Sequence, residues 1–292
     1  MSGRILGFFK QTFHEFSADE AATRAGSVAY YAALSLAPMV LLFISITGFL
    51  GASTQERMIR SVEEAVGPQA GQIVSTVAAR GGGQAGKAGV SMVISLAVIA
   101  FSASGVLAAL QAGLNRIWDV KPAPGAGAKG WARKRLLSMA MVAAIAFLLL
   151  LSLVATTVIG MILPASGAAW NLVSMAVSFA VFVLLFALMF KVLPDVKIAW
   201  RDVWPGAAVT ALLFAVGKYV IGLYIANADY SQSYGAAGSV VAMLVWVYYG
   251  SVIFFFGAEV TQVLAQRRGR ELRPNEHAVH YREVIDGQPA PA

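Results

Sequence analysis

Residues 237–264 read AGSVVAMLVWVYYGSVIFFFGAEVTQVL, and this stretch decides the class of fold. Glu259 is its one charged side chain. A helix of about 20 apolar residues is long enough to cross the hydrocarbon core of a bilayer. Because that core offers no water to the backbone, a continuous apolar run of this length favours a transmembrane helix.

Five further stretches have the same character, and the composition of the whole chain agrees with them. Hydrophobic residues make up 58% of the 292 residues, the mean hydropathy is +0.70, and charged residues account for only 13%. Soluble domains carry about 25% charged residues, which they need to cover their surface. We therefore expect an all-α, polytopic membrane bundle rather than a soluble domain. The six predicted transmembrane helices are 25–50, 89–113, 137–163, 170–193, 203–225 and 237–264.

The distribution of basic residues predicts the orientation of this bundle. Seventeen of the 22 Lys and Arg residues lie on the side that carries both termini, and four lie in the connection 51–88. Loops rich in Lys and Arg stay in the cytoplasm, so both termini are predicted to be cytoplasmic. The predicted organisation is an N-terminal amphipathic segment 1–24, a transmembrane domain 25–265, and a tail 266–292.

Three segments outside the spans have patterns of their own. Leu6, Phe9, Phe13 and Phe16 share one face of a helix, which predicts an N-terminal helix lying in the membrane interface. Apolar residues recur at helical spacing in the outer loop 51–88, so we expect a helical cap there. The tail 266–292 is charged and rich in proline near its end, and it is predicted to be disordered.

The sequence contains no set of residues that predicts enzymatic chemistry. There is no cysteine, which excludes thiolate nucleophiles and thiolate metal sites. The carboxylates on the predicted cytoplasmic side come from separate connections and lack the spacing of metal ligands. We therefore expect no catalytic residue, cofactor or metal, and no nucleic-acid partner, since topology accounts for the basic residues. The carboxylates in question are Asp19, Glu20, Asp119, Asp195 and Asp202.

Two ionisable side chains, Lys218 and Glu259, fall inside the predicted spans. Such residues are costly in a bilayer and are candidates for function. Lys218 is expected either to extend toward the outer interface or to meet Asp229. Glu259 lies near the inner end of its span, at a different depth from Lys218. A basic residue on the inner side is its expected partner: Arg24, Lys191 or Arg201.

Polar side chains also follow one face of the first span. Tyr31 and Ser35 share that face with Arg24, Ser27 and Pro38. The face could line a polar cavity, or it could serve hydrogen bonding and close packing between helices. The residues predicted to line a cavity or substrate path are Tyr31, Ser35, Asn115, Lys218, Tyr234 and Glu259.

Several motifs resemble a known family in their order and spacing. The first span contains AGSVAYYAALSLAP (25–38), the second ends with LQAGLNRIW (110–118), and the fifth is introduced by LPDVKIAWRDVWPG (193–206). The last span carries SYGAAG (233–238), WVY (246–248) and GAE (257–259). Together these resemble the YihY/virulence factor BrkB family of bacterial inner-membrane proteins over about residues 15–265.

The resemblance implies a protein of the bacterial inner membrane with six core helices, and much less about activity. The family once carried the name ribonuclease BN, but no connection here is long enough for a nuclease domain. Our leading hypothesis is a transporter-like bundle that handles a small solute or a lipid, with membrane lipids as its surroundings and an anionic lipid as one candidate ligand. The rival is a non-transporting scaffold for envelope assembly, and a ribonuclease is the remote alternative.

Overall fold

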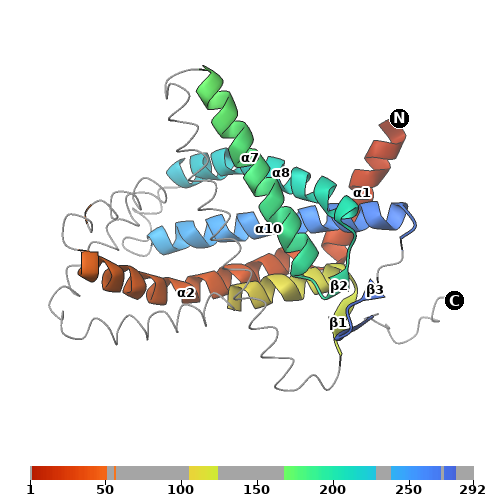
Figure 1. Cartoon of the computed structure of the whole chain (residues 1–292), viewed down its shortest axis with the longest axis horizontal. Helices are drawn as coiled ribbons and strands as arrows, with labels where there is room; N and C mark the ends of the chain where they lie inside the picture. The colour runs from red at the N-terminus through yellow and green to blue at the C-terminus, as the bar shows by residue number, and fades with distance from the viewer. Residues whose placement is uncertain are drawn as a thin grey trace. The chain divides into compact units, whose positions relative to one another are not determined.

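The computed structural model describes residues 2–50, 56, 105–123, 168–227, 238–270 and 273–280. Nearly all of them are helical, as Figure 1 shows. Residues 105–117 form one helix. The other long helices are α1 (Ser2–Ala18), α2 (Ala21–Leu50), α7 (Ala168–Val192), α8 (Trp200–Asn227) and α10 (Gly238–Arg267).

Four of the predicted spans coincide with α2, α7, α8 and α10. Span 137–163 and most of span 89–113 lie outside the described residues. Among the described helices, two segments are long and apolar enough to cross a membrane, Met175–Val192 and Val240–Arg267, with mean hydropathies of 2.4 and 2.0. In each segment, the apolar window of 18 residues that meets this criterion is 28% buried. A bilayer accommodates apolar helix surface that the protein itself leaves uncovered, whereas water does not.

The chain forms two compact units. The first unit consists of Met1–Ala25, Leu110–Gly217 and Val252–Ala292, and the second of Gly26–Ala109 and Lys218–Ser251. Within the second unit, the ring of Tyr31 on α2 lies against Gly105, where a Cβ atom would be 3.1 Å from its Cδ1.

Phenylalanines form the core of the first unit. Phe186 and Phe190 are one turn apart on α7, and their rings stack with centroids 6.5 Å apart. Phe190 packs on Phe254 of α10 at 5.0 Å, and Phe186 packs on Phe214 of α8 at 5.9 Å. Residues spaced by four lie on one face of a helix, so a single stripe of α7 contacts both other helices.

The helices α8 and α10 cross at two glycines. A Cβ atom on Gly206 would lie 1.8 Å from Thr261 Oγ1, and one on Gly257 would lie 1.6 Å from Thr210 Oγ1. Each threonine donates a hydrogen bond to the glycine carbonyl four residues earlier in its own helix, at 2.7 Å for Thr210 and 2.9 Å for Thr261. Small residues spaced by four allow helix backbones to approach closely, which is typical of membrane helices.

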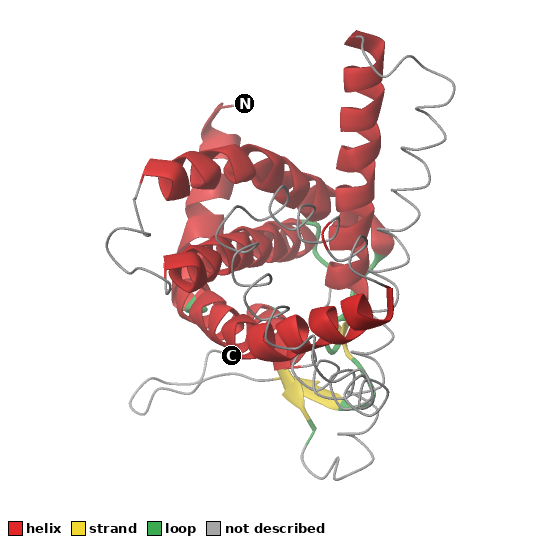
Figure 2. Ribbon diagram, turned by 90° about the vertical axis from the view of Figure 1, so that its left-hand side faces the viewer, coloured by secondary structure: helices red, strands yellow, loops and turns green. Residues whose placement is uncertain are grey.

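Short strands join the segment after α10 to two connections of the first unit. Strand β4 (Ala278–His280) pairs with β1 (Val120–Pro122), and β3 (Arg273–Pro274) pairs with β2 (Val196–Lys197), both antiparallel. Figure 2 shows these strands in yellow. Gly269, with φ of 64°, turns the chain at the end of α10, because glycine adopts this conformation without strain.

The described residues are mostly helical, as predicted, and the strands add only ladders of two or three residues. They correct one sequence prediction, which concerns the tail. The disorder predicted for 266–292 does not hold over 273–280, where backbone hydrogen bonds to the connections order the segment. Residues 281–292 lie outside the described residues.

The N-terminal segment is helical, as predicted, and leaves part of its apolar face uncovered. Leu6 is 73% exposed, and Phe9 and Phe13 are also exposed. The rings of Phe13 and Phe16 contact Phe256 of α10 at 5.2 and 6.0 Å. The position of α1 in a membrane interface stays a prediction. In the outer loop, only Glu56 is described, and it is helical.

Candidate functional site

Glu259 is the most unusual polar residue of the first unit. Glu259 lies on α10 and its side chain is completely buried. Neither carboxyl oxygen has a hydrogen-bond partner among the described residues. Glu259 therefore does not form the predicted ion pair with Arg24, Lys191 or Arg201, and that prediction is wrong. Burying a carboxyl group without a partner costs several kcal/mol when the group is charged. Arg24 instead donates to the Asp19 carbonyl at 3.0 Å, and Lys191 donates to the Ile198 carbonyl.

Two more buried polar atoms of the first unit, Gln262 Oε1 and Trp118 Nε1, have no hydrogen-bond partner among the described residues. Gln262 is one turn further than Glu259 on the same face of α10. The side-chain nitrogen of Gln262 donates to the carbonyl of Ile117, at the end of helix 105–117. Trp118 is the next residue along the chain and is buried. The face of α10 that carries Glu259 thus carries a further acceptor, Gln262 Oε1, without a partner in the described part of the chain.

The charges that act most strongly on Glu259 are those of other carboxylates: Asp19, Glu15 and Asp119. Asp19 lies between α1 and α2, is largely buried, and pairs with Arg116 Nε at 3.2 Å. Burial, followed by the charge of the neighbouring Asp119, raises the pKa of Asp19 to about 6, while Arg116 opposes the rise. A carboxyl with this pKa gains and loses a proton near neutral pH.

Asn115 fixes the connection between α7 and α8. Its side chain donates to Asp195 Oδ2 at 2.8 Å and accepts from the Asp195 backbone nitrogen at 2.7 Å. Gln111 donates to Asp195 Oδ1 at 3.2 Å, and the backbone nitrogen of Asn275 donates to the Asp195 carbonyl at 2.9 Å. Asn115 is therefore a positioning residue for this connection.

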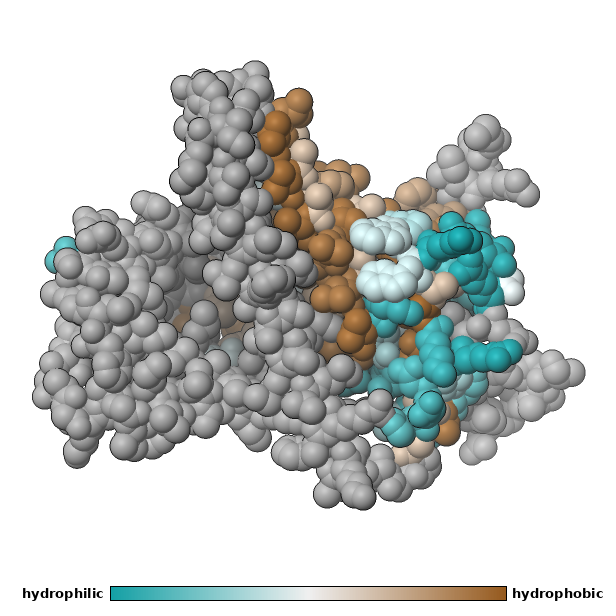
Figure 3. Space-filling model, viewed as in Figure 1, coloured by the Kyte–Doolittle hydropathy of each residue, from teal (hydrophilic) through white to brown (hydrophobic). Residues whose placement is uncertain are grey.

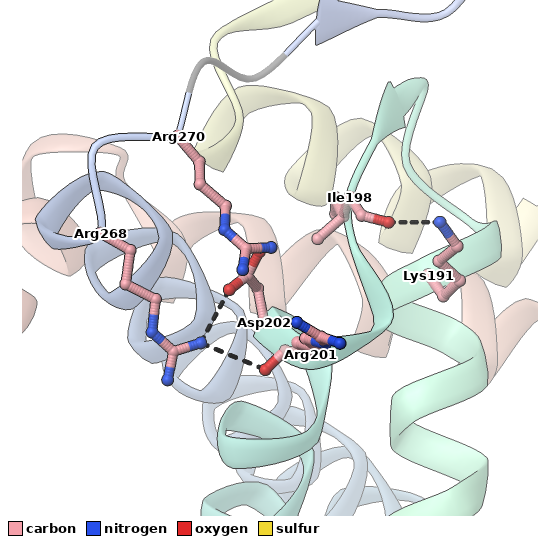
Figure 4. A network of polar contacts seen from close by, with 6 residues as sticks. All are labelled: Lys191, Ile198, Arg201, Asp202, Arg268 and Arg270. Carbon is pink, nitrogen blue, oxygen red and sulfur yellow. Dashed lines mark hydrogen bonds and ion pairs between the residues drawn. The ribbon is translucent and has the colours of Figure 1, made fainter.

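Asp202 organises a second network, which Figure 4 shows. It lies in the first turn of α8 and is buried, and its oxygens accept from Arg268 at 2.8 Å and Arg270 at 2.6 Å. Arg268 also donates to the Arg201 carbonyl at 3.2 Å. In a helix that carbonyl would accept from the residue four positions later, which here is Pro205 and has no N–H. The arginine supplies the missing donor.

The shared cavity of the six predicted residues stays a prediction, and the described residues among them belong to two units. Asn115 and Glu259 belong to the first unit, and Tyr31 and Ser35 to the second. The Ser35 hydroxyl donates to the Ala32 carbonyl at 2.7 Å, within its own helix. Lys218 lies on α8, but its side chain, like Tyr234, is outside the described residues.

Sequence reasoning did not single out Trp118 or Gln262, whose buried polar atoms lack partners among the described residues. Trp118 and Gln262 are uncharged and lie within apolar stretches, so nothing in their spacing marked them. Asp19, Asp195 and Asp202 were recognised as carboxylates on one side, but each enters a separate network with partners from distant parts of the chain. Across the described ranges, no group of three His, Cys, Asp or Glu side chains is arranged to hold a metal ion.

Comparisons with known proteins identify the family. The model of the virulence factor BrkB family matches residues 12–282, which confirms the resemblance seen in the sequence. A ribonuclease-like protein of Bacillus subtilis (strain 168), YfkH, is 23% identical over 94% of this chain and 100% of its own length.

Two further relatives carry the name UPF0761 membrane protein. That of Pseudomonas paraeruginosa is 28% identical over 90% of this chain, which spans 64% of its length. That of Pseudoalteromonas atlantica is 26% identical, over 88% of this chain and 85% of its own. No solved structure matches the chain. The chain belongs to the virulence factor BrkB family, and it is a membrane protein.

Proposed function

We propose that this protein is a transporter-like membrane protein that handles a small solute or lipid, and that Glu259 takes up a proton or a cation in each cycle. The observation that carries the proposal is the completely buried carboxyl of Glu259, whose oxygens have no hydrogen-bond partner in the described part of the chain. Ionisable groups in membrane segments are costly, and they mark ion and proton pathways. A group kept only for stability would have a basic partner.

Two features support a path from the charged end of the first unit to Glu259. The carboxylates Asp19, Glu15 and Asp119 act on it electrostatically, so negative charge attracts protons and cations toward it. Asp19 exchanges a proton near neutral pH, since its pKa is about 6. Gln262, one turn from Glu259 on α10, adds an acceptor, Oε1, that has no partner among the described residues.

The test uses the proton as the probe. Purified protein is reconstituted in liposomes on a solid-supported membrane, and a pH step is applied outside. The wild type should produce a transient charge displacement, and Glu259→Gln should reduce it at least tenfold. Glu276→Gln removes an exposed carboxylate and should behave as wild type. Equal displacement in Glu259→Gln and wild type would overturn the role of Glu259.

A chemical test of the same carboxyl distinguishes loss of function from loss of fold. Dicyclohexylcarbodiimide reacts with protonated carboxyl groups in apolar surroundings, and mass spectrometry locates the adduct. We expect an adduct on Glu259 in the folded wild type. Its absence at every pH would count against proton uptake at this residue.

We also propose the finer topology: six transmembrane helices in the bacterial inner membrane, both termini cytoplasmic, and α1 in the interface. The exposed apolar face of α1, with Leu6 and Phe9, supports the last point. The chain has no cysteine, so Glu276→Cys introduces a unique thiol. A membrane-impermeant maleimide should label it only after permeabilisation of intact cells, and labelling before that would refute the orientation.

We propose further that the protein is not an enzyme and binds no nucleic acid, despite the ribonuclease-like name of the Bacillus relative. In support, Asp195 and Asp202 are engaged by Asn115, Gln111 and two arginines. RNA cleavage that co-purifies with the wild type through stringent chromatography, and disappears in a carboxylate variant, would refute this.

A scaffold for envelope assembly is the second candidate, favoured by the exposed apolar face of α1. The charge-displacement experiment separates the two. A scaffold predicts no displacement in the wild type, whereas a transporter predicts displacement that depends on Glu259.

A further inference from the structure

The junction of α7 and α8 carries an exposed surface that the proposed transport path does not use. We call it the Trp200 surface, and it consists of Lys191, Trp200, Arg201 and Trp204. The two tryptophans are 44% and 42% exposed, and their ring centroids lie 6.2 Å apart. Lys191 Nζ lies 6.0 Å from the centroid of the Trp200 ring. Exposed tryptophan rings leave apolar area in water, and such rings are enriched at interfaces, so a partner for this surface is to be expected.

The neighbouring helix indicates that this partner belongs to a membrane. Lys191 lies in the last turn of α7, at the end of the apolar segment Met175–Val192, and Trp200 follows after the short connection. Figure 3 shows the brown surface of the first unit passing into pale and then teal surface. Tryptophan is enriched where hydrocarbon meets headgroups, and lysine reaches from an apolar helix end into that layer. The Trp200 surface therefore has the composition of a headgroup-level surface.

The charge of the surroundings selects the kind of headgroup. Arg268 and Arg270 share one buried carboxylate, Asp202, so one positive charge of that network is not neutralised. Their side chains are 42% and 37% exposed. Arg201 is exposed as well, and only its backbone carbonyl is used by Arg268 (Figure 4). The basic groups thus outnumber the acidic ones.

We propose that the Trp200 surface binds the headgroup of an anionic phospholipid in the leaflet predicted to be cytoplasmic. The Lys191 ammonium has three donors and uses one for the Ile198 carbonyl, which leaves two for phosphate oxygens. The Arg201 guanidinium can hold a phosphate with two parallel hydrogen bonds. The rings of Trp200 and Trp204 lie beside the glycerol and the upper acyl chains. This site is independent of Glu259, so either proposal can fail alone.

The test measures lipid retention by native mass spectrometry. Protein in mixed micelles receives equal amounts of phosphatidylglycerol and phosphatidylcholine, and the retained lipids are counted. We expect the wild type to retain phosphatidylglycerol preferentially. Removing one basic residue near anionic lipid costs about fivefold in binding, or about 1 kcal/mol. Lys191→Ala and Arg201→Gln should each show this loss, and Arg201→Gln keeps the backbone carbonyl that Arg268 uses.

A matched control separates a site from diffuse charge. Lys197→Ala removes an equal charge from the exposed face of β2, a few residues away. It should retain phosphatidylglycerol as the wild type does. Loss of retention in Lys197→Ala equal to that in Lys191→Ala, or equal retention of the two lipids by the wild type, would overturn the proposal.

A fluorescence measurement checks the position of the rings. Phosphatidylglycerol with brominated acyl chains should quench the wild type more strongly than brominated phosphatidylcholine does. The difference should disappear in the double variant Trp200→Phe/Trp204→Phe, because the proposal places these two rings beside the acyl chains. Persistence of the difference in the double variant would place the bound lipid at another site.

Discussion

Replacing Gly257 by alanine should force α8 and α10 apart. The new methyl group would lie 1.6 Å from Thr210 Oγ1 and 2.9 Å from Thr210 Cβ. Rotation of the hydroxyl removes the first clash, but it breaks the 2.7 Å hydrogen bond to the Gly206 carbonyl. The second clash persists, since a Cβ atom cannot move without its backbone.

The magnitude follows from these two effects. The broken hydrogen bond costs about 1 kcal/mol. Separating the helices to admit the methyl group costs about 1–3 kcal/mol. Alanine is the better helix former and returns up to about 1 kcal/mol. The expected net loss is therefore about 1–3 kcal/mol in the free energy of unfolding.

Thermal unfolding in detergent, followed by tryptophan fluorescence, measures this loss. In chains of about 150–250 residues, 1 kcal/mol moves Tm by about 2–4 °C. Gly26→Ala is the matched control, because a Cβ atom at Gly26 would have no neighbour within 4 Å. It should leave Tm unchanged or raise it slightly. A Tm of Gly257→Ala at or above that of wild type would refute the close crossing.

Two further predictions concern the charged end of the first unit. Asn115→Ala removes both hydrogen bonds to Asp195 and should lower the free energy of unfolding by about 2–4 kcal/mol. Hydrogen exchange of the backbone amides in 194–198 should then accelerate. The control Gln11→Ala loses only an exposed contact with Arg267 and should leave that exchange unchanged. The raised pKa of Asp19 means that the folded state holds a proton which the unfolded state has lost between pH 3.8 and about 6. The free energy of unfolding should therefore fall by up to about 3 kcal/mol as pH rises through this window. Asp19→Asn should remove this part of the pH dependence. An identical pH profile of the free energy of unfolding in the variant and the wild type would contradict the prediction.

The apolar runs made the helices predictable. Length, hydropathy and the requirement for internal hydrogen bonding act within one stretch of chain, so α2, α7, α8 and α10 could be read from the sequence. The short strands could not, because two or three residues carry no periodicity and each strand depends on a distant partner. The bond between Asn115 and Asp195 joins residues 80 positions apart, which no local pattern indicates.

The candidate site was predicted in part. Glu259 stood out because a lone carboxylate in an apolar run is conspicuous. Its lack of a partner was missed, since the expectation that a buried charge is paired pointed to a basic residue. Trp118 and Gln262 became visible only in the folded structure, where a buried polar atom of each has no partner among the described residues.

Strand β3 pairs with β2 and strand β4 with β1, and this has a consequence for biosynthesis. The first unit draws on the beginning, the middle and residues 252–292 of the chain, so it cannot be completed until residue 280 has been translated. At typical synthesis rates that takes roughly 15–60 s. Until then, the connections around β1 and β2 lack their backbone partners. A ribosome that stalls before residue 273 thus leaves a nascent protein without these last contacts, and quality-control proteases could recognise it as incomplete.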